Sequence, residues 1–161
     1  MTEYYAEKFQ QALEYQDFIL RELKKRDDMP SFACYASQKY QYEYGEGPCG
    51  LEIKFDTKFK ETGNIFIEVE EKTDTNNAEF VPSGIMRCDN SWLYLIGNYE
   101  EAFILGVEQI ICYCKSYEKY SLNKVFSNTK TSKGILFPVN FLLSRHLCLR
   151  HLFFQKADDT N

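Results

Sequence analysis

Residues 50–72, GLEIKFDTKFKETGNIFIEVEEK, decide how this chain folds, because they contain two short runs of alternating side chains. In residues 51–56 each apolar residue is followed by a charged one. In residues 65–72 the apolar set is Ile65, Ile67 and Val69, and the other set is Phe66, Glu68, Glu70 and Lys72. Because successive side chains on a strand point to opposite faces, each run predicts a strand with one apolar and one largely charged face.

The segment between the two runs predicts how the strands are connected. Thr62-Gly63-Asn64 contains two residues that tolerate positive φ, which is typical of a tight turn. We therefore expect residues 51–57 and 64–72 to pair as an antiparallel hairpin, whose apolar face packs on the first helix. The opposite face of this hairpin would bring together Asp56, Glu68 and Glu70.

Carboxylates gathered on one sheet face repel one another, which raises the pKa of some of them. A hard divalent cation such as Mg²⁺ relieves this repulsion, because it prefers carboxylate oxygens as ligands. The alternative interpretation is a solvent-exposed sheet face with cross-strand Glu–Lys pairs, since antiparallel sheets often have one wet face. The alternation by itself is compatible with both.

Length and composition favour one domain over residues 1–155, followed by a frayed tail at 156–161. The chain has 161 residues, of which 44% are hydrophobic, and no apolar run reaches the ~18 residues that a membrane span needs. The start, MTEYYAEKFQ, has no apolar signal segment, and the six cysteines form no CxxC pair. We therefore expect a cytoplasmic protein with reduced thiols and no membrane association.

Charge is unevenly distributed along the chain. Residues 1–110 carry a net charge of −10, whereas residues 111–161 carry +5. Such a contrast favours an anionic partner for the basic part, although chance segregation of solvated charges would look the same. The predicted nucleic-acid-binding residues in this part are Lys119, Lys124, Lys130 and Lys133.

The remaining elements follow from periodicity and from turn residues. Residues 2–26 predict an amphipathic helix, and the aromatic residues 31–44 favour strand in part. Further along, the pattern predicts a buried strand at residues 92–96, a helix at 100–117, a strand up to Pro138 and a short helix after it.

The predicted order of elements is a helix, three strands, a loop, a strand, a helix and a strand. This order resembles the core of the PD-(D/E)XK nuclease superfamily. The chain is also similar to a family of uncharacterised bacterial and phage proteins with that core. The similarity lies in GEGPCGLEIKFD, TGNIFIEVEEK and VPSGIMRCDNSWLYLIG, which fall within residues 45–97. It implies a single α/β (α+β) domain with a restriction-endonuclease-like core, in which helices flank a mixed β-sheet.

The resemblance also implies a site. An acid at one strand end and an E-x-K motif on the next strand would make Asp56, Glu68 and Glu70 the metal ligands, with Glu70 and Lys72 catalytic. No proline precedes Asp56, and two other registers fit the motif. One takes Glu68 as the motif's glutamate, with Lys72 reaching back. The other uses Glu52-Ile53-Lys54 with Glu46 upstream, which adds Glu46 and Glu52 as further acids.

The implied function is that of a Mg²⁺- or Mn²⁺-dependent endonuclease, a hydrolase that cleaves phosphodiesters in DNA or RNA, with DNA favoured. The alternative is a nuclease-like fold without cleavage, which serves as a nucleic-acid-binding or protein-interaction module, for example a phage or bacterial defence-related factor. A protein partner and a homodimer are compatible with either function.

Overall fold

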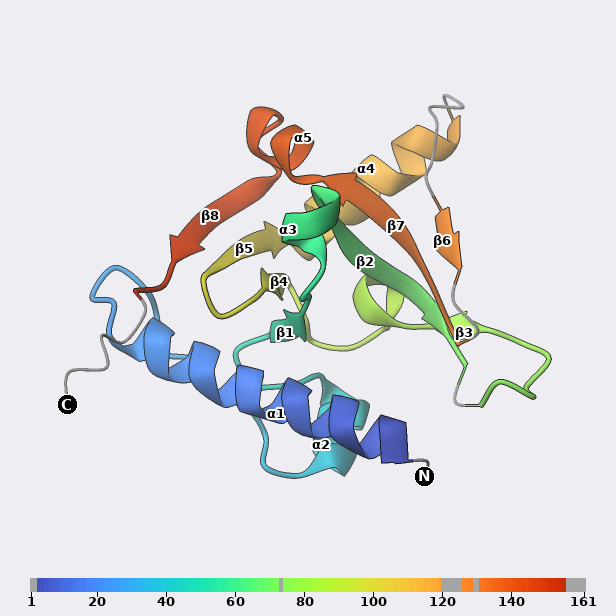
Figure 1. The fold of residues 1–161 in the computed structure, drawn as a ribbon, viewed down its shortest axis with the longest axis horizontal. Coiled ribbons are helices and arrows are strands. Elements are labelled where there is room, and N and C mark those ends of the chain that lie inside the picture. The colour runs from blue at the N-terminus through green and yellow to red at the C-terminus, as the bar shows by residue number, and fades with distance from the viewer. Residues whose placement is uncertain (1–2, 73, 120–125, 129–130, 156–161) are drawn as a thin grey trace.

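The computed structural model describes residues 3–72, 74–119, 126–128 and 131–155 and has a mixed α/β fold (Figure 1). Its helices are α1 (Glu3–Lys24), α2 (Gln38–Tyr44), α3 (Phe59–Thr62), the 3-10 turn η1 (Gly84–Met86), α4 (Val107–Lys119) and α5 (Val139–Ser144). Its strands are β1 (Leu51–Phe55), β2 (Asn64–Glu71), β3 (Val81–Pro82), β4 (Leu93–Gly97), β5 (Glu101–Gly106), β6 (Phe126–Asn128), β7 (Ser132–Pro138) and β8 (Cys148–Phe153).

The strands form two four-stranded sheets. Sheet A has the order β1-β4-β5-β8, in which β1 runs parallel to β4 and the other neighbours are antiparallel. Sheet B has the order β3-β2-β7-β6 and is antiparallel throughout. Sheet A is therefore the mixed sheet of the fold, and its strands β4 and β5 are the central ones.

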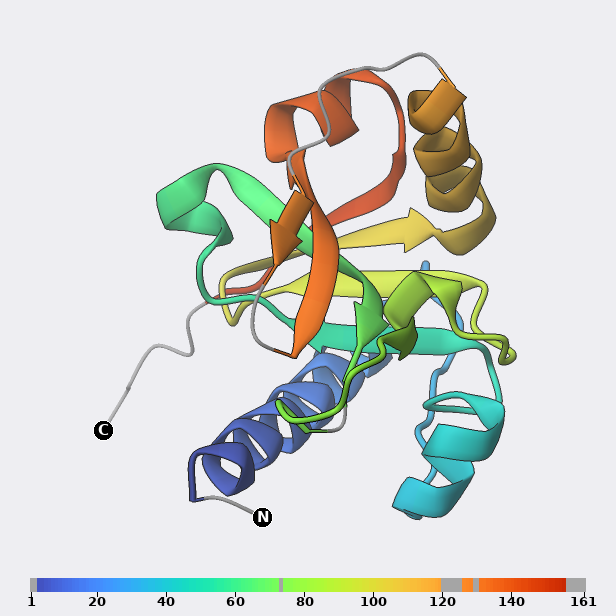
Figure 2. The ribbon, with the colours of Figure 1, turned by 90° about the vertical axis from the view of Figure 1, so that its right-hand side faces the viewer.

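Helix α1 covers one face of sheet A, as Figure 1 and Figure 2 both show. Tyr15, Ile19 and Leu23 recur every four residues, so they lie on one face of the helix and are all buried. They pack with alternate residues of the sheet, including Leu95, which is fully buried. Phe9 is 40% exposed, because the first half of α1 projects beyond the sheet.

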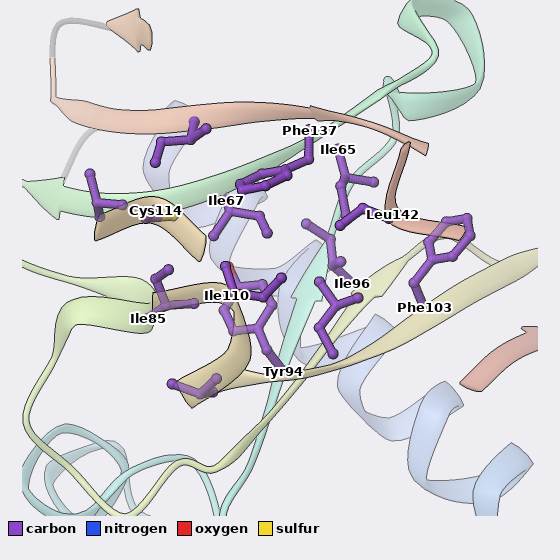
Figure 3. Close-up of a cluster of buried hydrophobic side chains, with 14 of the residues drawn as sticks. Ile65, Ile67, Ile85, Tyr94, Ile96, Phe103, Ile110, Cys114, Phe137 and Leu142 are labelled. Atoms are coloured by element: carbon purple, nitrogen blue, oxygen red, sulfur yellow. The ribbon is translucent and has the colours of Figure 1, made fainter. Parts of the chain in front are cut away.

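The opposite face of sheet A forms a second core with sheet B, α4 and α5. Figure 3 shows side chains from both sheets meeting in this space. The fully buried members include Ile65, Ile67, Phe103, Leu105, Ile110 and Leu142. Sheet A is thus buried on both faces, which explains why β4 and β5 read as continuous apolar runs.

The predicted hairpin between residues 51–57 and 64–72 is wrong, although both segments are strands. β1 pairs with β4 in sheet A, whereas β2 pairs with β7 and β3 in sheet B. The connection also differs from a tight turn. Both Lys58 and Phe59 donate their backbone N–H to Asp56 Oδ1, which starts the single helical turn α3, and Gly63 ends it at φ +69°.

Two other elements differ from the sequence-based expectation. Residues 38–44 are helical rather than strand, and the tilted rings of Tyr40 and Tyr44 lie 5.9 Å apart, one helical turn from each other. Residues 101–106 form β5, and the helix that was expected from residue 100 begins at Val107. Short apolar runs such as residues 102–105 fit a buried strand as well as a helix, and here the pairing with β4 decides.

The other expectations for secondary structure are confirmed, and the strands β3, β6 and β8 are additions to them. The helix over residues 2–26, the strand at 92–96, the strand ending at Pro138 and the short helix after it are all present. β8 was not expected, and it supplies the outer strand of sheet A beside β5. In the part of the chain that the structure describes, no helix combines the length and apolar character needed to cross a bilayer.

Candidate functional site

A pocket of about 550 Å³ opens where the end of β1 approaches the first half of β2. Its polar lining comes mainly from the end of β1, the α3 segment and β2. These polar residues are Lys54, Asp56, Thr57, Lys58, Thr62, Asn64, Glu68 and Tyr94, and the apolar ones are Phe55, Phe66, Ile96 and Leu136. Two of the expected acids, Asp56 and Glu68, therefore share one pocket although their strands belong to different sheets.

Asp56 joins the two sheets through its carboxylate. Its Oδ1 accepts the N–H of Lys58 at 2.8 Å and that of Phe59 at 3.2 Å. Its Oδ2 accepts the N–H of Phe66, on β2, at 3.2 Å. The Asp56 backbone N–H in turn donates to Gly97 at the end of β4. Asp56 is thus held firmly at the pocket wall, with one lone-pair site left of about four.

Glu68 is oriented by two serines. Ser83 Oγ donates to Glu68 Oε1 at 2.7 Å, and Ser132 Oγ donates to Oε2. Ser83 is nearly fully buried, which keeps one side of the carboxylate out of water. Each oxygen of Glu68 keeps further acceptor capacity, because an ionised carboxylate offers about four lone-pair sites.

Glu70 does not line the pocket, because the alternation along β2 breaks before it. The register of β2 against β7 shifts between Glu68 and Glu70, so that Val69 is an extra residue in a β-bulge. A one-residue shift moves the following side chains to the other face. Glu70 accordingly lies beside Lys133 on β7, and the two side chains form an ion pair at 2.7 Å.

Lys72 lies outside the pocket as well. Its ammonium group sits 4.5 Å from the centre of the Phe80 ring, and its backbone N–H donates to Thr131. Of the four predicted nucleic-acid-binding lysines, only Lys133 has a described side chain. Lys124 and Lys130 lie outside the described residues, and for Lys119 the structure describes the backbone at the end of α4.

The third motif register, Glu52-Ile53-Lys54 with Glu46, corresponds to a compact ionic cluster beside the pocket. Lys54 Nζ lies 2.8 Å from Glu52 Oε1 and 3.6 Å from Glu46 Oε1. Glu46 Oε2 also accepts the N–H of Ile53 and the side-chain amide of Gln16 on α1. Because Lys54 lines the pocket as well, this cluster and the pocket form one continuous polar region.

Burial and charge set the protonation of this cluster. Burial tends to lower the pKa of Lys54, but the carboxylates of Glu52 and Glu46 outweigh it and hold that pKa well above its usual range. Burial raises the pKa of Glu46, although Lys54 acts in the opposite direction. Glu52 is fully buried. Its Oε1 lies close to Lys54 Nζ, but among the described residues neither carboxylate oxygen of Glu52 accepts a hydrogen bond of good geometry.

Tyr94 is a pocket residue that sequence reasoning missed, because it lies inside the apolar run WLYLI. Burial raises the pKa of its hydroxyl well above the usual range, while Lys54 lowers it and Glu52 and Glu68 raise it further. The phenol therefore stays protonated and can donate into the pocket. A tyrosine within an otherwise apolar strand is a usable sequence signal, since a buried hydroxyl needs a polar partner.

Protein side chains alone do not complete a metal-ligand shell here. Within the described ranges, no group of three His, Cys, Asp or Glu side chains is placed to hold a metal ion. A magnesium ion does not require three, because it commonly takes one or two carboxylates and completes its shell with water and substrate phosphates. Asp56 and Glu68, with spare acceptor sites in one pocket, fit that pattern, whereas Glu70 does not take part.

Comparison with known proteins gives no match: neither a protein-family model, nor a curated protein, nor a solved structure matches this chain.

Proposed function

We propose that this protein is a Mg²⁺-dependent nuclease whose site is the pocket between β1 and β2. One observation carries the proposal: Asp56, Glu68 and Lys54, two acids and a lysine from different sheets, line the same pocket. These are residue types that metal-dependent phosphodiester hydrolysis uses, since hard-cation ligands and a fixed positive charge then act on one phosphate. In the site predicted from the sequence, Lys72 is the catalytic lysine and Glu70 is a metal ligand. In the pocket, the lysine is Lys54, and Glu70 lies outside the lining.

The donor set fits the ion. Asp56 and Glu68 are hard oxygen ligands, and their hydrogen bonds to Phe66, Ser83 and Ser132 hold them in place without using every lone pair. Bound Mg²⁺ would polarise the phosphoryl group and lower the pKa of a water molecule at this site.

The residues of the chain supply positioning and charge. Lys54 stays protonated because Glu52 and Glu46 raise its pKa, so it offsets negative charge on the phosphoryl oxygens and does not act as a base. The ion pair of Lys54 with Glu52 fixes the ammonium group at the pocket wall. Tyr94 and Asn64 offer neutral donors in the same lining, and Lys58 adds a second positive charge.

The alternative is a binding module without cleavage, and one observation favours it. All four carboxylate oxygens of Asp56 and Glu68 already accept hydrogen bonds from the protein. Carboxylates held in this way also stabilise the junction of two sheets without any metal. The two functions differ in whether Mg²⁺ binds and whether a phosphodiester is cut.

The test compares Asp56→Asn and Glu68→Gln with the wild type. We expect Mg²⁺ to raise the thermal midpoint of the wild type and to support cleavage of single- and double-stranded DNA and of RNA. Each variant should lose most of both effects, because a neutral amide is a much weaker Mg²⁺ ligand. Glu70→Gln is the matched control, since Glu70 lies on the same strand outside the pocket, and it should keep the Mg²⁺-induced rise of the thermal midpoint.

Two results would contradict the proposal. One is a wild type whose thermal midpoint and nuclease activity do not respond to Mg²⁺ or Mn²⁺. The other is a Glu70→Gln variant that loses activity while Glu68→Gln keeps it, which would restore the sequence-based register. Circular dichroism of each variant separates loss of the site from loss of the fold.

A further inference from the structure

Two lysines converge on one aromatic ring at the far end of β2. Lys72 Nζ lies 4.5 Å from the centre of the Phe80 ring, and Lys133 Nζ lies 4.1 Å from it. The two ammonium groups are therefore no more than about 9 Å apart. The ring attracts each cation, which orients both side chains toward Phe80. We call Lys72, Phe80 and Lys133 the Phe80 clamp.

Lys72, Lys133 and the ion-pair partner Glu70 together carry two positive charges and one negative charge. Glu70 neutralises Lys133 at 2.7 Å, whereas Lys72 forms no ion pair with a carboxylate in the described part of the chain. An anion beside the ring would be attracted by both ammonium groups. The Lys133 side chain is 35% exposed, and Phe80 is half-buried, so an anion can approach from solvent.

The position of the clamp relative to the pocket suggests which anion it takes. Lys72 follows Glu68 by four residues, and at roughly 3.3 Å per residue, with the bulge at Val69 in between, this separates them by at most about 13 Å. Each nucleotide of a nucleic-acid strand carries one backbone phosphate, so a separation of this size falls within a few nucleotides. A strand with one phosphate in the pocket can thus present another phosphate at the clamp.

We infer that the Phe80 clamp binds a backbone phosphate of the nucleic-acid strand whose cleavage takes place in the pocket. The substrate class rests on the proposed function, but the clamp itself is a separate binding site. A phosphodiester beside the ring offers two non-bridging oxygens as acceptors for these ammonium groups. Glu70 pairs with Lys133 in the free protein and lowers the cost of keeping the lysine there without a ligand.

The experiment measures equilibrium binding in the absence of cleavage. A fluorescein-labelled DNA single strand is titrated with protein in EDTA, and fluorescence anisotropy gives Kd between about 50 and 200 mM salt. Lys72→Gln/Lys133→Gln is compared with Lys39→Gln/Lys115→Gln. Both control lysines are exposed, so the two double variants remove the same charge at different places.

We expect the clamp variant to bind roughly fivefold or more weakly than the control, because one backbone phosphate is no longer neutralised at a defined place. The slope of log Kd against log salt should flatten by about 0.7 for each phosphate that the protein no longer neutralises, the value for single strands. Phe80→Leu should also weaken binding, although it changes no charge, since the lysines then lack the ring that orients them.

The inference is overturned if the clamp variant and the control bind equally, or if the wild type does not bind DNA or RNA at low salt. Its outcome is separable from that of the proposed function. Weaker binding by the clamp variant together with no cleavage by the wild type in Mg²⁺ supports the clamp and rejects the nuclease. Cleavage by the wild type with equal binding by both double variants rejects the clamp and supports the nuclease.

Discussion

Single residues in this fold serve the architecture and the site at once. Asp56 is the clearest case: its carboxylate starts α3, accepts an N–H of β2 and lines the pocket. Glu46 is another, since it receives an edge N–H of β1, an amide from α1 and the charge of Lys54. An unpaired edge strand is prone to pair with other chains, and the Glu46 side chain covers that edge at Ile53.

The raised pKa of Glu46 makes stability depend on pH with a definite sign. When the folded-state pKa of a carboxyl exceeds its unfolded value of about 4.3, its contribution to stability is fully present below that value. The contribution is lost as the pH rises through the folded-state pKa. We expect the free energy of unfolding of the wild type, relative to Glu46→Gln, to decrease from pH 4 toward pH 7.

Urea unfolding of both proteins at several pH values tests this expectation. The glutamine keeps an acceptor for Ile53 and for Gln16, so the comparison isolates ionisation. A difference that increases with pH would show that Lys54, not burial, dominates the ionisation of Glu46.

At the scale of elements, the β-bulge in β2 decides which acids face the pocket. Without it, Glu68 and Glu70 would lie on one face, as strict alternation predicts. With Val69 as the extra residue, Glu68 stays in the pocket and Glu70 pairs with Lys133. Close packing of β2 on β7 accompanies this arrangement, because a Cβ at Gly134 would lie 2.4 Å from the Phe66 ring and 2.6 Å from the Ile67 carbonyl oxygen.

Gly134→Ala should therefore destabilise the protein by about 1–3 kcal/mol, since the backbone of β2 must move to admit the methyl group. Gly63→Ala is the contrasting variant. Nothing lies within 4 Å of its Cβ position, and only its φ of +69° opposes alanine, at a cost of about 1 kcal/mol. Thermal unfolding of both variants tests whether Gly134→Ala loses more stability than Gly63→Ala. A larger loss of stability for Gly63→Ala would mean that β2 and β7 can separate enough to admit the methyl group.

At the scale of the whole molecule, sheet A couples two cores. Its one face packs on α1, and its other face packs on sheet B with α4 and α5. Leu95 and Ile96, neighbours on β4, belong to different cores and are both nearly fully buried. Damage to either core must therefore strain the same strands, which predicts that the chain unfolds as one unit.

Ile19→Ala tests this coupling from the α1 side, because Ile19 is fully buried and belongs to the core that sheet B does not enter. We expect a loss of about 3 kcal/mol and a thermal midpoint lower by roughly 10 °C. Far-ultraviolet and near-ultraviolet circular dichroism should report the same single transition. Separate transitions, with α1 lost before the sheets, would contradict a single cooperative domain.

The sequence was sufficient to predict elements whose signal is local. Helical spacing predicted α1, and alternation predicted β1 and β2 as strands, because burial on one side imposes a period on nearby residues. It brought Asp56 and Glu68 together only through a hairpin that does not form, and the two line one pocket across the junction of the two sheets. The apolar run at residues 101–106 has no such period, which is why a strand there was taken for a helix.

Strand partners and the lysine of the site were decided only by the tertiary structure. Alternation says which side of a strand is apolar, but not whether that side packs beside Leu95 or Ile135, since pairing depends on residues distant in sequence. The bulge at Val69 exists only because β2 pairs with β7, and it removes Glu70 and Lys72 from the pocket. Lys54 enters the site from β1, where buried Glu52 and half-buried Glu46 form ion pairs with its ammonium group.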